Sequence, residues 1–431
     1  MQRIRVSDNH RFLVHNDGTP FFWLGDTAWE LFHRLTRDET DLYLQNRAHK
    51  GFTVIQAVVL AELDGLRVPN ANGDVPLIEV DPTQPNEAYF QHVDWVIDRA
   101  ASLGLYVGLL PTWGDKVNQR YDWAKGPEVF NESNAAEYGT FLGNRYRNRL
   151  NIIWILGGDR DPDERAVAIW RAMATGILKG VGRRENALMT FHPQPFESGS
   201  SSRWFHDDEW LSLNMLQTGH DRHKNTFEQI TADYNRLPAK PVLDGEPTYE
   251  AHGLSFKPFE NGYSSDAEVR KFAYWALFSG ACGHTYGCHS IWQFYAPGRE
   301  GINFPIYYWT DALDLAGASQ MRHLSALMTR PSITDRIPDQ SLLAGHQPKD
   351  DEYIVATRTT DGRFVLVYTP TGRTFGIDTR ELAGESVCWH WFNPRDGSET
   401  VPQTVPKTAV LSFQPPNSGY GHDWVLLLSP L

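Results

Sequence analysis

The sequence predicts an α/β fold, a (β/α)8 TIM barrel over residues 1–330, followed by a small all-β sandwich over residues 331–431. Eight apolar runs of strand length alternate with helix-like segments, a pattern typical of a parallel sheet. Acidic and aromatic residues follow several of these runs, where barrels carry their functional loops. From about residue 331, short apolar runs separated by Gly, Pro and Asn turns replace the alternation, which favours a sandwich.

The first elements are a hairpin and the first barrel strand. Asn16-Asp-Gly18 is a strong turn signal between two apolar arms, and the second arm continues as a barrel strand that ends at Gly25-Asp-Thr27. A doubly wound open sheet is the alternative fold. It would normally carry a Gly-rich phosphate loop after its first strand, and Gly25-Asp-Thr-Ala28 is no such loop.

The next three barrel units follow the same pattern. Continuous apolar runs predict buried parallel strands at 53–60, 105–110 and 152–156. Periodic apolar positions predict helices between and before them, at 36–50, 88–103 and 135–147. Gly104 directly after the second of these helices is a typical C-terminal stop.

The remaining units are shorter. Strands are predicted at 187–191, 211–216, 242–243 and 283–286, and helices at 162–178, 226–235 and 266–278. Sandwich strands are predicted at 353–357, 363–368, 386–392 and 424–428. Alternation places Trp389 and Trp391 on one face, which is either a binding face or, as strand aromatics favour, the core.

Composition excludes several classes of protein. The chain has 431 residues, of which 41% are hydrophobic and 22% charged, as in globular proteins. Its formal net charge of -13 argues against a nucleic-acid partner, which requires a basic surface, and against charge-driven membrane binding. No apolar run has transmembrane length. The oligomeric state is left open.

Cysteine content and the N-terminus bear on location. The three cysteines, Cys282, Cys288 and Cys388, are too few for a disulfide scaffold, although a Cys282–Cys288 bridge stays open. The N-terminal residues show no apolar h-region, so no signal peptide is expected. The sequence leaves the location open. The protein is either cytoplasmic, or exported by a signal peptide that has been removed from this chain.

Two carboxylates stand at the ends of predicted strands. Asp159 ends Trp154-Ile-Leu-Gly-Gly-Asp159, after the fourth strand, and Glu246 ends Val242-Leu-Asp-Gly-Glu246, after the seventh. Two carboxyl groups facing one pocket are what glycoside hydrolysis needs, one to donate a proton and one to attack or to activate water. The structural alternative is an ion pair or a helix cap.

The chain resembles the apiosidase-like proteins, glycoside hydrolase family 140. The resemblance rests on motifs spread over residues 1–330, which are Trp23-Leu-Gly-Asp26-Thr-Ala-Trp29, Ala61-Glu-Leu-Asp64-Gly65, Pro111-Thr-Trp113-Gly-Asp115, Trp154-Ile-Leu-Gly-Gly-Asp159 and Gly245-Glu-Pro-Thr-Tyr249. The tail resembles the collagen-binding-type β-sandwich that often follows that barrel.

The resemblance implies hydrolysis of apiofuranosyl linkages in plant pectin (rhamnogalacturonan II). By analogy with other barrel glycosidases, Asp159 is then the general acid/base and Glu246 the nucleophile. A separation of about 5–5.5 Å between the two carboxyl groups would imply retention of configuration, and one of about 6.5–9.5 Å would imply inversion. Many such barrels carry Asn-Glu where this chain has Gly158-Asp159, and the shorter side chain leaves the stereochemistry open. Another furanoside or β-glycoside, and a non-catalytic carbohydrate-binding barrel, are the alternatives.

Other residues at strand ends are predicted to bind an oligo- or polysaccharide. Carboxylates suit sugar hydroxyls and aromatic rings suit sugar faces, and each residue could instead stabilise its own loop. The predicted set is Asp26, Trp29, Glu62, Asp64, Trp113, Asp115, His192, Gln217, His220, His284, Tyr286 and Trp292.

No metal or cofactor is expected. The run from Asp159 to Glu164 departs from a calcium loop at its glycine and glutamate positions, and Asp161 or Asp163 is expected to cap the next helix. His220 and His223 lie close together but without the HExxH pattern of zinc enzymes. A serine nucleophile elbow is also missing from the sequence.

Overall fold

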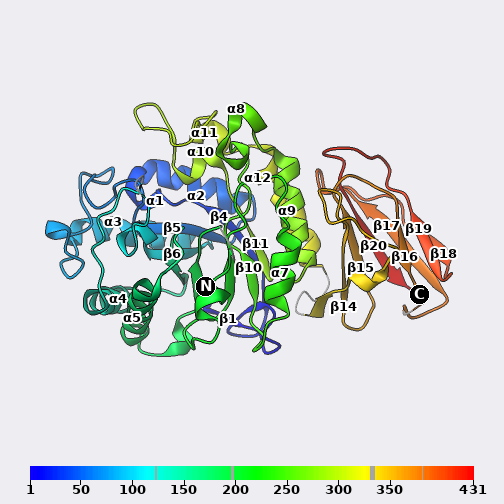
Figure 1. Ribbon diagram of the computed structural model, residues 1–431, viewed down its shortest axis with the longest axis horizontal. Helices are drawn as coiled ribbons and strands as arrows, with labels where there is room; N and C mark the ends of the chain where they lie inside the picture. Colours follow the sequence, from blue (N-terminus) through cyan, green and yellow to red (C-terminus); the bar gives the residue numbers. More distant parts are fainter. Residues whose placement is uncertain (122–123, 196–198, 331–334, 381) are drawn as a thin grey trace.

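The computed structural model describes residues 1–121, 124–195, 199–330, 335–380 and 382–431. Within them it confirms a parallel α/β barrel followed by antiparallel sheets (Figure 1). The boundary predicted at 330/331 touches residues 331–334, which lie outside the described residues. All three cysteines are free, so the Cys282–Cys288 bridge left open by the sequence is not formed.

The barrel sheet has eight parallel strands among the described residues. In chain order they are β4 (Trp23–Thr27), β5 (Val54–Leu60), β6 (Tyr106–Thr112), β7 (Ile152–Gly157), β8 (Met189–His192), β9 (Asn214–Leu216), β10 (Val242–Asp244) and β11 (Gly283–Tyr286). β11 pairs with β4, so the sheet closes on itself except between β8 and β9. That seam is bridged by Ser212 N–H to Met189 O and by the Thr190 hydroxyl to Leu213 O, each 2.8 Å.

Helices cover the outside of the barrel. They are α1 (Leu31–Arg34), α2 (Arg37–His49), α3 (Glu87–Ser102), α4 (Glu132–Tyr146), α5 (Glu164–Val181), α6 (Ser202–Phe205), α7 (Thr226–Tyr234), α8 (Pro258–Asn261), α9 (Asp266–Phe278), α10 (His289–Trp292), α11 (Trp309–Ala312) and α12 (Ala316–Met328). Thr36 and Glu39 form a capping box on α2, and Asp163 caps α5, as expected. No helix of the described residues is long and apolar enough to span a bilayer.

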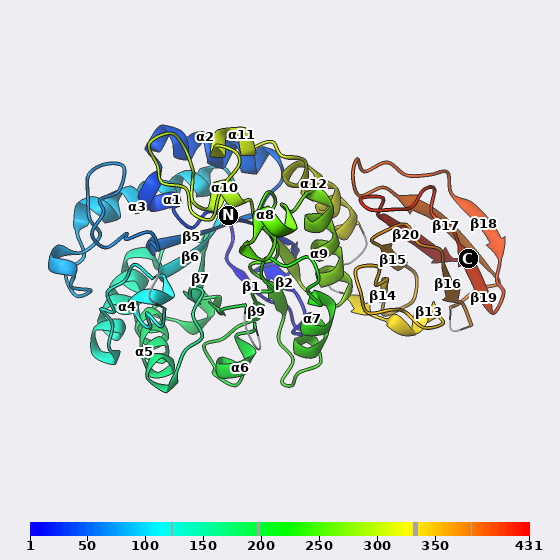
Figure 2. The ribbon, with the colours of Figure 1, turned by 45° about the horizontal axis from the view of Figure 1, so that its top comes forward.

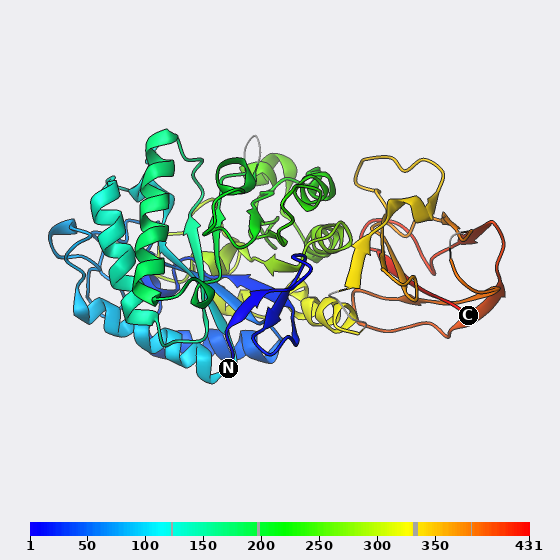
Figure 3. The same ribbon diagram turned by 90° about the horizontal axis from the view of Figure 1, so that it is seen from below.

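Strand alternation separates two cores. Side chains such as Trp23, Val54 and Leu243 point into the barrel, whereas Leu24 and Ile55 pack under the helices. A small sheet of β1 (Ile4–Val6), β2 (Leu13–His15) and β3 (Pro20–Phe21) packs its apolar side chains into the inner core at one end of the barrel (Figure 3). The opposite end, where the parallel strands finish, is left for function.

The C-terminal sheets face each other across their own core. One sheet has the order β12 (Arg336–Pro338), β14 (Val355–Thr359), β15 (Val365–Thr369), β20 (Trp424–Pro430), β17 (Ser386–Phe392) and β18 (Gln403–Pro406). The other consists of β13 (Leu343–Ala344), β16 (Phe375–Asp378) and β19 (Val410–Phe413). Trp389 and Trp391 pack in this core, in agreement with the core interpretation of their shared face.

The sandwich packs on the barrel through α9 and α12, which lie between the two sheet systems (Figure 2). Tyr274 of α9 stacks on Tyr368 of β15, with ring centroids 4.7 Å apart. Beside this stack, the buried guanidinium of Arg270 lies 2.9 Å from the buried carboxylate of Asp423. Apolar residues of β14, β15 and β20 belong to the same cluster as the barrel helices, so the interface is continuous core.

Candidate active site

Asp159 stands at the end of β7 on a sharply turned backbone. Gly157, Gly158 and Asp159 all have positive φ (86°, 128° and 53°), and a Cβ on Gly158 would lie 2.8 Å from Gly114 N. Glycine is therefore required at residue 158. Backbone hydrogen bonds tie this turn to the ends of β6 and β8, through Gly114 N–H to Gly158 O and Gly158 N–H to His192 O, each 3.0 Å. The turn leaves the Asp159 side chain one-fifth exposed (21%).

Glu246 follows β10 and is buried between two histidines. Nε2 of His192 lies 3.0 Å from one carboxylate oxygen, and Nε2 of His220 lies 3.3 Å from the other. The preceding carbonyl, Gly245 O, accepts a hydrogen bond of 2.9 Å from the buried amide of Gln56, on the opposite side of the barrel. Each carboxylate oxygen of Glu246 therefore has its own histidine contact.

The two carboxyl groups have opposite pKa shifts. Burial raises the pKa of Asp159 to about 6, opposed by Arg160 and reinforced by the charge of Glu246. Burial also acts to raise the pKa of Glu246, but hydrogen bonds from His192 and His220 outweigh it and lower the pKa to about 2. Paired carboxyls whose environments separate their pKa values are typical of acid–base sites.

His192 touches both acids. Asp159 N–H lies 3.4 Å from Nδ1 of His192, which places the ring proton on Nε2, the nitrogen that faces Glu246. Trp29 holds the imidazole from the side, with ring centroids 5.3 Å apart. The His192 ring therefore lies between the Asp159 backbone and the Glu246 carboxylate and contacts both.

Two more carboxyl groups lie nearby. Burial raises the pKa of Glu62 to about 8, reinforced by the charges of Asp159 and Asp115 and opposed by Arg160. Asp115 is fully buried beside Lys116, with 2.8 Å between its carboxylate and Nζ. The site thus combines one carboxyl with a low pKa, one near 6 and one near 8.

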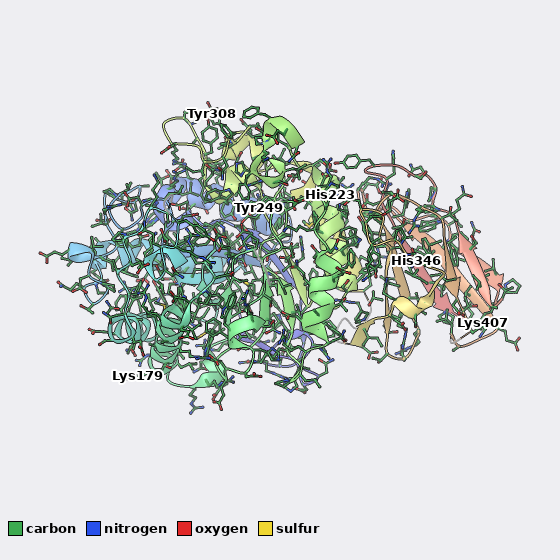
Figure 4. All side chains as sticks on the ribbon, in the orientation of Figure 1. Lys179, His223, Tyr249, Tyr308, His346 and Lys407 are labelled. Atoms are coloured by element: carbon green, nitrogen blue, oxygen red, sulfur yellow. The ribbon has the colours of Figure 1, made fainter. Side chains whose placement is uncertain are left out.

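Aromatic side chains surround these acids. Trp29, Trp113 and Trp292 are all buried in the inner core, and the ring centroids of Trp29 and Trp113 are 5.2 Å apart. Trp29 Nε1 donates a 3.2 Å hydrogen bond to the Tyr249 hydroxyl, and that hydroxyl also hydrogen-bonds Glu246. Tyr249 lies in the middle of the barrel (Figure 4). These rings form an apolar frame around a charged centre.

Two family models match this chain. Residues 7–335 match the family model described as "Apiosidase-like, catalytic domain". The chain belongs to the apiosidase-like family. Residues 337–429 match a second model, described as "Putative collagen-binding domain of a collagenase". A search of curated proteins finds no match.

Solved structures similar to this apiosidase-like chain are glycoside hydrolases. One, named "Glycoside hydrolase", is 33% identical with a TM-score of 0.89 and covers 100% of this chain and 97% of its own. A family 5 glycoside hydrolase from Bacteroides vulgatus ATCC 8482 is also 33% identical, with a TM-score of 0.89 and coverage of 99% and 93%. The chain is therefore a glycoside hydrolase, and its substrate is a carbohydrate.

Most of the sequence-predicted residues of the apiosidase-like barrel meet around the two acids. Besides Asp159 and Glu246, the residues brought together at the strand ends are Trp29, Glu62, Trp113, Asp115, His192, Gln217, His220 and Trp292. Gln217 hydrogen-bonds the Asp159 carboxylate.

Four predicted residues lie elsewhere. Asp26, His284 and Tyr286 point outward from β4 and β11, because they alternate with the inward-facing Trp23 and Thr285. The Asp26 carboxylate lies 2.5 Å from Arg47 of α2. The Tyr286 hydroxyl donates to Glu250, at 2.6 Å, and His284 is fully buried.

Asp64, the fourth, belongs to the loop after β5. Its carboxylate pairs with Arg67 at 2.8 Å and its backbone has a φ of 57°. This ion pair lies within the loop, and a contact between Asp64 and the substrate stays a prediction. Asp64 thus also fits the alternative role of such loop acids, which is to stabilise their own loop.

The sequence reasoning missed several functional neighbours. Tyr249 was not among the candidates, although it follows Glu246 by three residues in a motif already quoted. Arg160, buried with Nη1 3.0 Å from the Asp159 carboxylate, and Gln56, whose amide crosses the barrel, had no local signal. Both act through contacts between distant strands or a folded turn, which no short pattern encodes.

A cavity of about 380 Å³ opens beside the Asp159 turn. It is lined by Asn118, Arg120, Asp161, Pro162, Asp163, Arg203 and Trp204. Among the described residues, no group of three His, Cys, Asp or Glu side chains is arranged to hold a metal ion.

Proposed function

We propose that this glycoside hydrolase cleaves apiofuranosyl linkages of pectin, such as those of rhamnogalacturonan II, with retention of configuration. Glu246 is the nucleophile and Asp159 the general acid/base. The observation that carries the assignment is that both acids meet at His192, with Glu246 between two histidines and Asp159 beside Arg160. The opposite pKa shifts of the two acids support the same roles. The apiosidase-like family match supports the sugar.

The first step uses the charge of Glu246 and the proton of Asp159. A carboxylate oxygen of Glu246 attacks the anomeric carbon, the bond from that carbon to the leaving oxygen breaks, and the Asp159 proton passes to that oxygen. A nucleophile with a pKa of about 2 is ionised throughout the working range, and an acid with a pKa of about 6 still holds a proton in mildly acidic solution.

The second step reverses the role of Asp159. Once Glu246 is esterified its charge is gone, and that charge is one of the causes that raise the pKa of Asp159. The pKa of Asp159 therefore falls in the intermediate, which suits a base. Asp159 takes a proton from water, the water oxygen bonds to the anomeric carbon, and Glu246 leaves as carboxylate.

The first test is hydrolysis of a panel of apiosides, pectins and other plant cell-wall glycans by the wild type and by Glu246→Gln. Release of apiose, or of a chain that ends in apiose, is expected from the wild type, with a loss of about a thousandfold or more in the variant. NMR of the first product formed is expected to show the substrate's own anomeric configuration.

Each possible outcome tests a different part of the proposal. Release of a different sugar that still depends on Glu246 would retain the two-carboxylate mechanism and reject apiofuranosyl specificity. An inverted first product would make Glu246 a base for water instead of a nucleophile. Near wild-type turnover by Glu246→Gln would reject the assignment of Glu246.

A further inference from the structure

Three phenylalanines stand exposed on the loops that follow β10 and β11. Phe256 ends the short helix η4 (Leu254–Phe256), Phe259 belongs to α8, and Phe304 lies on the loop between α10 and α11. Their exposed fractions are 52%, 83% and 58%. We call these three residues the aromatic rim. Large apolar side chains gathered on a surface are typical of binding sites.

The loops of the aromatic rim lie at the edge of the molecule that carries α8, α10 and α11 (Figure 1). The rings of Phe259 and Phe304 meet edge to face, with centroids 5.2 Å apart. The Tyr263 hydroxyl donates to Phe304 O at 3.1 Å and fixes the two loops together. Tyr308, labelled in Figure 4, lies on the same edge and is 42% exposed.

The backbone holds two of these rings outward at an energetic cost. Ser255 and Phe256 have φ values of 55° and 59°, and Asn303 and Phe304 have 57° and 59°. Bulky L-residues rarely adopt the left-handed region, and such conformations concentrate at functional sites. The same strained pair of residues, ending in an exposed phenylalanine, thus occurs on both loops.

The aromatic rim is continuous with the active site. The Phe256 ring packs edge-on against His252 and His220, at 4.9 and 5.6 Å between centroids, and His220 is one of the two histidines that contact Glu246. His252 in turn packs against His289, 4.4 Å away, whose Nε2 lies 3.0 Å from Asn303 O. A row of buried histidines therefore connects Glu246 to both strained loops.

We propose that the aromatic rim is a subsite that stacks against a sugar residue of a polysaccharide substrate, beyond the residue whose bond is cut. A flat ring exposed to water complements the C–H face of a sugar ring, and it leaves the hydroxyls at the edge in solvent. Phe256 packs on His220, which contacts Glu246, and this position next to the catalytic residues favours the glycan substrate itself over a protein partner. The inference rests on the proposed function only in taking the substrate to be a polymer.

The test measures binding and turnover separately, with Phe259→Ala, Phe304→Ala and the double variant. Phe364→Ala is the matched control, because Phe364 is also exposed (42%) but belongs to the sandwich. Affinity electrophoresis on gels that contain pectin, arabinan, galactan or mannan reports binding without any need for hydrolysis. Kinetics on a polymer and on p-nitrophenyl apioside report catalysis.

The expected result is a loss of about tenfold in polymer affinity in the double variant, with a rise in KM on the polymer and little change in kcat. The loss in kcat/KM on the polymer should exceed the loss on the nitrophenyl glycoside by the same factor. Phe364→Ala should retain wild-type retardation.

The outcomes distinguish the subsite from the proposed function. If wild-type protein binds none of the four polymers, or binds them equally well after the double substitution, the aromatic rim is not a sugar subsite. Equal losses on polymer and small glycoside would also overturn it. Failure to release apiose while polymer binding still depends on the rim would reject the apioside specificity and retain the subsite.

Discussion

His192 gives a direct way to test the state of Glu246. Its Nε2 lies 3.0 Å from the carboxylate, and its hydrogen bond is one of the causes of the low pKa of Glu246. We expect His192→Phe, which keeps a ring but removes the donor, to raise the pKa of Glu246. As pH falls, the variant would then lose activity at a higher pH than the wild type does. Below that pH, its kcat/KM would be about 10- to 100-fold lower than that of the wild type.

The measurement is the pH dependence of kcat/KM, with His220→Phe as a second donor variant. His346→Phe, an exposed histidine on the sandwich, is the control and should leave the profile unchanged. An acid limb that stays in place in both donor variants would contradict the role of the histidines.

Asp159 sets the alkaline side of the same profile. A general acid must carry its proton, so activity is present below its pKa and is lost as pH rises through about 6. Asp159→Ala should abolish this limb on a nitrophenyl glycoside, because that leaving group needs no proton. Added azide should speed turnover of the variant, because azide attacks the glycosyl-enzyme intermediate and frees Glu246.

Glu62 is the rival acid, and the profile separates the two. Its pKa is raised to about 8, by burial first and then by Asp159 and Asp115. An alkaline limb near 8 that disappears in Glu62→Gln would transfer the acid role from Asp159 to Glu62. A limb near 6 that survives Glu62→Gln supports Asp159.

At the scale of elements, α4 and α5 pack closely because both present glycines to each other. A Cβ on Gly139 would lie 2.5 Å from Met173 O, and one on Gly176 would lie 2.2 Å from Ala136 O. Gly143 and Gly180 repeat the contact one turn later. These positions exclude any side chain, since the opposing atoms are backbone.

Gly176→Ala should therefore destabilise the fold by about 1–3 kcal/mol, although alanine favours a helix by about 1 kcal/mol. Thr175→Ala, at the preceding, exposed position of α5, adds the helix preference without the contact and should be neutral or slightly stabilising. Urea unfolding of both variants is the measurement. A Gly176→Ala protein as stable as Thr175→Ala would mean that the helices can separate without cost.

Sequence patterns located the barrel strands but missed several strands of the sandwich. Continuous apolar runs placed β5, β6 and β7 within two residues, because strands buried on both faces have no other composition. They missed β16, β18 and β19 of the sandwich, whose exposed or alternating residues resemble loops. Asp26 shows what sequence patterns do not reveal about the site. Side chains alternate along β4, so the outward direction of Asp26 is known only once Trp23 is known to face inward.

At the scale of the whole molecule, barrel and sandwich share a buried ion pair. Arg270 and Asp423 are 1% and 2% exposed, and Asp423 also accepts from Tyr368 at 3.2 Å. Asp423→Ala removes this partner, while Asp266 still pairs with Arg270, so we expect a loss of about 1–3 kcal/mol. We expect one cooperative calorimetric transition for the wild type and a clearly lower Tm for the variant.

The control is Asp361→Ala, which removes a surface pair with Arg363 on the sandwich and should leave Tm almost unchanged. Two separate transitions in the wild type, or equal effects of the two substitutions, would show that the barrel and the sandwich fold independently despite their continuous core.

The open seam between β8 and β9 affects how readily the barrel opens locally. The two histidines that hold Glu246 come from opposite sides of that seam, His192 from the end of β8 and His220 from the loop after β9. With few cross-strand hydrogen bonds to break, local opening there requires less free energy than elsewhere in the sheet. Amide hydrogens at the seam should exchange with deuterium before those of β5 and β6, and substrate that bridges the site should slow them.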